Sequence, residues 1–93
     1  MADTITVQIP TALRPQVGDN ASVDVTGGTV AEVLASLTGQ YPELGKRLYK
    51  SEGEINRFIN VYLNDEDIRF LEDLNTPVKG GDELSIIPAI AGG

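Results

Sequence analysis

The chain ends in Gly92-Gly93, and the group with the clearest chemistry is the carboxylate that Gly93 carries. Because glycine has no Cβ atom, two glycines make a backbone thin enough for a channel that excludes other residues. A terminal glycine pair arises by chance in about one chain in 200 at ordinary glycine usage, so the pair alone is weak evidence. However, no side chain from Leu84 to Gly93 carries a charge, although the chain as a whole is acidic. We therefore expect Gly93 to be the reacting residue, with Gly92 keeping the path to it narrow.

The chain lacks the side chains that most enzymes use for catalysis. Its 93 residues include no histidine and no cysteine, which are the commonest general base and the strongest side-chain nucleophile. The usual ligands of transition metals are missing for the same reason, and Asn64-Asp65-Glu66-Asp67 lacks the spacing of an EF-hand calcium loop. We expect no metal site and no independent catalysis, so the chain should be a partner or a substrate of enzymes.

The charge balance argues against one class of partner. The chain has 14 acidic residues against 7 basic ones, a net charge of −7. Proteins that bind nucleic acids carry a basic patch that neutralises phosphates, and none is evident here. No apolar run approaches the roughly 18 residues of a membrane span, and the first residues lack the basic and apolar regions of a signal peptide. We expect a cytoplasmic protein that binds neither nucleic acid nor membrane.

Alternation of polar and apolar residues predicts strands. Between them, residues 30–41 have apolar residues at helical spacing, which predicts a helix. Thr29 and Glu32 form a capping box at the start of this helix, and Pro42 stops it. Strands are predicted at residues 4–9, 21–26, 57–63, 68–70 and 83–87, with loops or turns at 13–20, 27–28, 64–67 and 79–82. Residues 44–54 give no clear element beyond one short helical turn.

This order of elements predicts an α+β protein with the β-grasp (ubiquitin-like) fold. We expect a mixed sheet of four to five strands with one main helix packed on one face. Because Pro88 cannot donate a hydrogen bond to a neighbouring strand, pairing should falter there. The predicted organisation is one β-grasp domain over residues 1–88, followed by a flexible tail over residues 89–93 that ends in the glycine pair. These five tail residues extend at most about 17 Å.

The uncovered face of the sheet is the candidate partner-binding face. Strand alternation places Ile59, Val61 and Leu63 toward the helix, together with Leu84 and Ile86 of the last strand. The residues between them then point to the open face, where Phe58, Tyr62 and Ile87 should form an apolar patch leading to the tail. The candidate partner-binding residues, tail included, are Phe58, Asn60, Tyr62, Ser85, Ile87, Pro88, Ala89, Ile90 and Ala91.

Three stretches of the chain carry a resemblance that covers nearly all of it. They are Ile9-Pro10-Thr11 with Leu13-Arg14-Pro15, residues 57–70 with Asn64-Asp65-Glu66-Asp67, and residues 81–93 with Pro88-Ala89-Ile90-Ala91-Gly92-Gly93. On these residues the chain resembles the ThiS/MoaD family of sulfur carriers, and within it the actinobacterial carriers of cysteine synthesis. Residues 16–56 are the least distinctive part. The glycine pair alone is shared with ubiquitin-like proteins in general. Asn64-Asp65-Glu66-Asp67 together with the segment from Pro88 to Gly93 is typical of a much smaller group of proteins.

The resemblance implies a reaction cycle that partner enzymes carry out. An E1-like adenylating and sulfurating enzyme uses ATP to adenylate the Gly93 carboxylate, and a sulfur donor then displaces AMP to leave a thiocarboxylate. A sulfur-accepting synthase uses this sulfur; in cysteine synthesis the acceptor is an activated serine, and a peptidase later releases the product. The resemblance further implies that the carrier binds no cofactor of its own, because ATP is used by the activating partner. We expect a monomer when the carrier is free.

Three other functions fit the same residues. The chain could be a ubiquitin-like modifier that is conjugated to lysines of other proteins through Gly93. It could be the small subunit of a molybdopterin synthase, with the tail held permanently in an enzyme complex. It could also be a β-grasp module that binds a partner, in which case the glycine pair is incidental.

Overall fold

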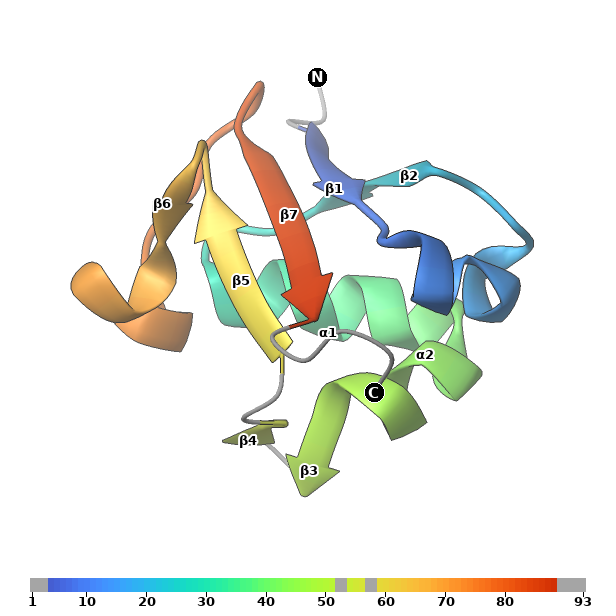
Figure 1. Ribbon diagram of the computed structural model, residues 1–93. Coiled ribbons are helices and arrows are strands. Elements are labelled where there is room, and N and C mark those ends of the chain that lie inside the picture. The colour runs from blue at the N-terminus through green and yellow to red at the C-terminus, as the bar shows by residue number, and fades with distance from the viewer. Residues whose placement is uncertain (1–3, 52–53, 57–58, 89–93) are drawn as a thin grey trace.

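Five strands form one mixed sheet in the order β2-β1-β7-β5-β6 (Figure 1). The structure is a computed structural model that describes residues 4–51, 54–56 and 59–88. The strands are β1 (Thr4–Gln8), β2 (Ser22–Thr26), β5 (Ile59–Leu63), β6 (Glu66–Asp67) and β7 (Glu83–Pro88). The central strand β7 is parallel to β1 and antiparallel to β5, and β1–β2 and β5–β6 are antiparallel pairs. This is the β-grasp arrangement that the order of elements predicts.

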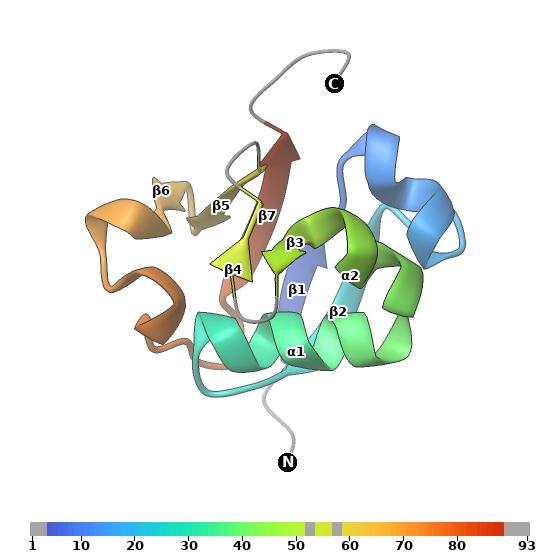
Figure 2. The ribbon, with the colours of Figure 1, turned by 90° about the horizontal axis from the view of Figure 1, so that it is seen from below.

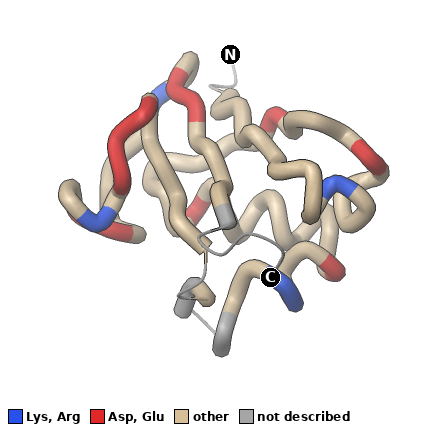
Figure 3. The backbone as a smooth tube through the Cα atoms, viewed as in Figure 1, with Lys and Arg blue, Asp and Glu red and all other residues tan. Residues whose placement is uncertain are grey.

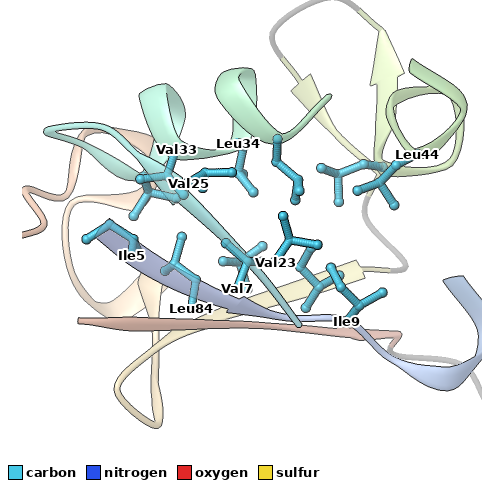
Figure 4. Packing of buried hydrophobic residues seen from close by; sticks show 14 of the residues in the cluster. Ile5, Val7, Ile9, Val23, Val25, Val33, Leu34, Leu44 and Leu84 are labelled. Atoms are coloured by element: carbon cyan, nitrogen blue, oxygen red, sulfur yellow. The ribbon is translucent and has the colours of Figure 1, made fainter. Parts of the chain in front are cut away.

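One main helix, α1 (Val30–Gln40), packs across one face of the sheet. Figure 2 shows α1 running across the strands, and Figure 4 shows apolar side chains filling the space between helix and sheet. The helix contributes four fully buried residues at helical spacing, which are Val30, Val33, Leu34 and Leu37. The sheet contributes the alternate residues Ile5, Val7, Val23, Val25, Val61, Leu84 and Ile86. Because one face of the sheet takes the helix, the core lies between these two layers.

The start of α1 is fixed by side-chain caps. The Thr29 hydroxyl accepts a hydrogen bond from the Glu32 backbone N–H at 3.2 Å. Glu32 in turn accepts from the Gly28 N–H, at 2.7 Å, so the returning bond reaches one residue before the usual capping-box donor. Gly27 lies so close to the helix that a Cβ atom there would be 2.7 Å from the Val33 nitrogen. The turn between β2 and α1 therefore depends on glycine at position 27 for space.

The predicted loop at 13–20 is largely a 3-10 helix, η1 (Thr11–Val17). Leu13 and Val17 are both buried in the core. Burial of these two side chains holds the segment by packing, which its polar local pattern with a single proline does not reveal. The loop prediction was wrong for this segment.

A second helix, α2 (Pro42–Leu48), follows α1 directly. The proline that stops one helix starts the next, because its missing N–H costs nothing at the first helical position. Leu44 and Leu48 of α2 are fully buried, which extends the single helical turn expected here to a short packed helix. The chain then forms a separate two-stranded sheet from β3 (Tyr49–Ser51) and β4 (Glu54–Ile55).

The short strand predicted at 68–70 lies earlier in the chain, at β6, and residues 68–70 form the 3-10 helix η2 (Ile68–Phe70). Asn64 and Asp65 both have positive φ, 49° and 73°, as in the tightest two-residue hairpin turns. The return strand can therefore begin at Glu66. It ends when Asp67 caps η2 by accepting from the Arg69 backbone N–H at 2.9 Å. A third 3-10 helix, η3 (Asp73–Asn75), completes this segment.

Strand β7 runs through Pro88, which pairs with Ile59, so pairing does not falter at the proline. The Asn64 N–H donates to the Glu83 carbonyl at 2.9 Å, and hydrogen-bonded pairs then recur at every second position of an antiparallel ladder. With Asn64 and Glu83 as a hydrogen-bonded pair, the pair of Ile59 and Pro88 is one of the pairs that exchange no hydrogen bond. On its other side, β7 pairs with β1 only from Glu83 to Ser85. The missing N–H of Pro88 therefore breaks no ladder bond.

Among the residues that the structure describes, no helix has both the length and the apolar character needed to cross a membrane.

Candidate partner-binding face

Strands β5 and β7 bring four of the predicted binding residues together on the open face. Asn60 lies opposite Ile87, and Tyr62 lies opposite Ser85. The intervening residues Val61, Leu84 and Ile86 are buried on the helix side, and Ile59 and Leu63 pack against the edge of the core. The predicted alternation of faces is therefore confirmed for the described part of these strands.

Among the described residues of this face, Ile87 is the exposed apolar side chain. It is 44% exposed, while Asn60, Tyr62 and Ser85 are half-buried. Phe58, the other apolar residue predicted for the patch, lies outside the described residues. So do Ala89, Ile90, Ala91, Gly92 and Gly93, whose roles stay predictions. Pro88 is placed at the end of β7, so the face leads to the point where the chain continues toward Gly93.

The half of the open face over β1 and β2 is polar. Thr6 donates to the Asp24 carboxylate at 2.9 Å. Gln8 donates to the Glu83 carboxylate at 2.8 Å, which links β1 to the start of β7. Because these polar groups satisfy one another, this half offers little apolar area to a partner. The candidate binding area is thus confined to β5, β7 and the adjoining edge at β6.

A nearly buried carboxylate, Asp82, fixes the turn that precedes β7. It accepts hydrogen bonds from the Lys79 backbone N–H at 2.9 Å and from the Asn64 side-chain amide at 3.1 Å. The side-chain oxygen Oδ1 of Asn64 in turn accepts a hydrogen bond from the Glu83 backbone N–H at 3.0 Å. The Lys79 N–H, followed by the Asn64 amide, lowers the pKa of Asp82 against the opposing effect of burial. This pair sets the register of β5 against β7, and hence which side chains reach the open face.

A second carboxylate, Asp67, fixes the edge of the face. Asp67 lies opposite Tyr62, and its carboxylate binds the Arg69 guanidinium with a shortest N···O distance of 2.7 Å. The Asp67 side chain is 7% exposed and that of Arg69 60%. Hydrogen bonds from the Arg69 side chain and backbone lower the pKa of Asp67. The sequence predicts turns at Asp67 and Asp82 but not these buried contacts. The signal that could have indicated them is the position of both residues directly beside strand ends.

No group of three or more acidic side chains in the described ranges is arranged to hold a metal ion. We expect this face to act in recognition, as a fixed surface beside the strand that leads toward the C-terminus.

Comparison with known proteins identifies the family. The model of the ThiS family matches residues 7–93, which is most of the chain and includes the glycine pair. The chain belongs to the ThiS family. This confirms the resemblance to ThiS/MoaD proteins that the sequence motifs indicate.

Relatives of this ThiS-family protein share both its sequence and its fold. It is 44% identical over 91 residues to the sulfur carrier protein CysO of Mycobacterium tuberculosis, covering 96% of this chain and 98% of the relative. A crystal structure of the Amycolatopsis orientalis BexX/CysO complex matches with a TM-score of 0.86 and 45% identity, covering 96% of this chain and 99% of that one. The solution structure of the small archaeal modifier protein 1 from Methanosarcina acetivorans matches with a TM-score of 0.86 and 31% identity, covering 100% and 99%. These matches confirm the β-grasp fold and the predicted similarity to carriers of the CysO type.

Proposed function

We propose that this ThiS-family protein is a sulfur carrier that works through the carboxylate of Gly93. An ATP-dependent E1-like enzyme adenylates this carboxylate, which is then converted to a thiocarboxylate and used as the sulfur donor in the synthesis of cysteine or another sulfur-containing metabolite. The observation that carries the proposal is the 44% identity to sulfur carrier protein CysO, over 96% of the chain. The family match that extends to Gly93 supports it.

The proposed reaction uses the Gly93 carboxylate and needs no side chain of this protein as a catalytic group. A carboxylate oxygen of Gly93 attacks the α-phosphorus of ATP, pyrophosphate leaves, and the carboxylate becomes an activated acyl group. Hydrosulfide, or a donor that delivers its equivalent, then attacks the carbonyl carbon; AMP leaves, a proton is released, and the thiocarboxylate remains. A chain without histidine or cysteine fits this division of labour, since the catalytic groups belong to the partners.

The described face supplies what a carrier needs besides its terminal carboxylate. A partner enzyme has to recognise the carrier before the glycine pair enters its active site. The open face around Ile87 offers an exposed apolar contact at the end of β7, and the hydrogen bonds of Asp82 hold this strand in register. A rigid binding surface beside a reactive chain end lets the partner choose the carrier by shape.

We propose two classes of partner, an activating E1-like enzyme and a sulfur-accepting synthase, with the carrier monomeric between the two encounters. The similar structure of a BexX/CysO complex supports complex formation by a carrier of this fold. ATP is bound by the activating enzyme, and the carrier itself holds no cofactor.

A second candidate function is that of a ubiquitin-like protein modifier. The chain is 38% identical over 72 residues to the small archaeal modifier protein 1 of Haloferax volcanii, covering 76% of this chain and 78% of the relative. In this function Gly93 forms an isopeptide bond with a lysine of another protein.

Intact-mass measurement of the protein purified from its native host separates the two functions. A carrier yields a species in which one terminal oxygen is replaced by sulfur, and this species disappears when the cells cannot make the activating enzyme. A modifier yields larger conjugates joined through Gly93. Finding only conjugates, with no thiocarboxylate under any sulfur supply, would contradict the carrier proposal.

A further inference from the structure

The most exposed large apolar side chain in the described part of the protein lies away from the candidate face. Phe70, at the end of η2, is 81% exposed, and its neighbour Leu71 is 37% exposed. Figure 1 shows η2 and η3 as the orange segment beyond β6, at the edge of the sheet. The sequence pattern alone indicates no role for either residue.

The segment that carries Phe70 is held from its N-terminal side. Ile68 is buried in the core, and the Leu71 N–H donates to its carbonyl at 2.9 Å. The Arg69 backbone and guanidinium both bind Asp67, as described above. Phe70 therefore directly follows two residues whose positions are fixed, Ile68 by burial and Arg69 by charge-assisted hydrogen bonds.

The same segment is held from its C-terminal side. The Thr76 hydroxyl is buried; it donates to the Asp73 carbonyl at 2.7 Å and accepts from the Glu72 N–H at 3.0 Å. Leu74 packs against the core, and the Val30 N–H of α1 donates to the Thr76 carbonyl at 3.0 Å. Phe70 is thus exposed on a segment that is held at both ends. A partner that buries this side chain would gain apolar contact and lose little conformational entropy of the backbone.

The charges around Phe70 indicate the chemistry of such a partner. Residues 65–73 contain five acidic residues and one basic residue, so they carry −4 of the net charge of −7. The basic residue, Arg69, is neutralised by Asp67. The other four acidic side chains are exposed and take part in no ion pair within the described chain; they are Asp65, Glu66, Glu72 and Asp73. Figure 3 shows the acidic residues along this edge.

We propose that Phe70 and Leu71 form a second docking surface, which binds an apolar pocket rimmed by lysine and arginine on the activating enzyme. This inference rests on the proposed function. Ile87 lies on the open face near the end of β7, whereas Phe70 lies at the sheet edge beyond β6. Contact at Ile87 alone would leave the carrier free to turn about its own C-terminal segment. Contact at both places fixes its orientation while Gly93 is adenylated.

The test uses the full chain and the purified E1-like adenylating enzyme of the same organism. Calorimetry measures the affinity between them, and pyrophosphate release measures the kinetics of adenylation. Phe70→Ala should weaken binding roughly 10- to 100-fold and raise KM for the carrier by a similar factor, with kcat unchanged. Phe70→Leu keeps an apolar side chain and should lose much less. Because Phe70 is exposed, both variants should keep the melting temperature of the wild-type protein.

The acidic rim is tested with Glu72→Gln combined with Asp73→Asn. Asp73 has a positive φ of 54°, a conformation that asparagine also tolerates. This variant should associate more slowly at low salt and show a weaker dependence on ionic strength. The matched control removes two exposed acidic charges elsewhere, by Asp19→Asn combined with Glu43→Gln, and should behave like the wild-type protein.

The possible results separate the two proposals. If the wild-type chain is not adenylated at Gly93, the proposed function fails. If the wild-type chain is adenylated and Phe70→Ala binds with unchanged affinity and KM, the second docking surface is wrong. If sedimentation shows that the wild-type chain dimerises and that Phe70→Ala abolishes the dimer, the surface binds a second copy and the inference is overturned.

Discussion

Asp82 shows how a single carboxylate can decide which side chains a strand presents. It lies at the start of β7, accepts from the Lys79 N–H and the Asn64 amide, and is nearly inaccessible to solvent. Through Asn64 it joins the turn after β5 to the first residue of β7. Because a shift of one residue would turn every side chain of a strand to the other face, this local network protects the position of Ile87 at the far end of β7.

The depressed pKa of Asp82 predicts a loss of stability in acid. Its pKa is lower in the folded protein than in the unfolded chain, so the unfolded state binds the proton first as the pH falls. The contribution is complete above the unfolded pKa of about 4 and disappears as the pH falls through the lower folded pKa. Asp82→Asn should lower the free energy of unfolding at pH 7 by about 1–3 kcal/mol.

Urea unfolding at pH 7 and at pH 3 checks this prediction, with Asp65→Asn as the control. Asp65 is exposed, so its variant should keep both the wild-type stability and its pH dependence. If Asp82→Asn lost as much stability as the wild-type protein on going from pH 7 to pH 3, Asp82 would not be responsible for the pH dependence.

At the scale of elements, local patterns predicted those features that have local causes. The alternation of Ile59, Val61 and Leu63 and the capping residues Thr29 and Glu32 act within a few residues of where they stand, and each prediction is confirmed. The predictions were incomplete or wrong where distant packing decides the structure. Burial of two leucines makes a helix after Pro42, and the burial of Ile68 replaces a predicted strand with a 3-10 turn.

The close approach of Gly27 to α1 predicts a large effect of a small substitution. A Cβ atom at position 27 would lie 2.7 Å from the Val33 nitrogen and 2.9 Å from the Val33 Cγ2 atom. Gly27→Ala should therefore lower the free energy of unfolding by about 1–3 kcal/mol, because backbone has to move. At Gly28 the nearest atom is the Glu32 carboxylate, a flexible chain end, 3.2 Å from the added Cβ. Chemical denaturation of Gly28→Ala should show a clearly smaller loss; equal losses would mean that the contact with α1 does not matter.

The alternation of β7 predicts opposite outcomes for two adjacent substitutions. Ile86 is buried and Ile87 is 44% exposed. Ile86→Asp should unfold the domain, because it buries a charge without a partner. Ile87→Asp should keep the melting temperature and weaken binding to the activating enzyme roughly tenfold or more. Circular dichroism and calorimetry separate the two effects, and unfolding by Ile87→Asp would show that the assignment of faces is wrong.

At the scale of the whole molecule, the proposed function separates recognition by the sheet from chemistry at Gly93. The sheet and α1 enclose the core, the other face carries Ile87, and β7 ends where the chain continues toward Gly93. The proposed reactivity of the Gly93 carboxylate was inferred from the sequence without any fold, because its signal is the glycine pair and the uncharged run before it. The second docking surface could not be inferred in this way, since the exposure of Phe70 depends on how the segment after β6 is anchored.

Deletion of Gly93 tests the proposed function most directly. The full chain and the chain lacking Gly93 are each incubated with the activating enzyme, ATP and sulfide, and their intact masses are measured. The full chain should gain the mass difference between sulfur and oxygen, while the shortened chain should stay unchanged and keep the same melting temperature. Equal conversion of both chains to a sulfur-bearing product would show that the Gly93 carboxylate is not the group that carries sulfur.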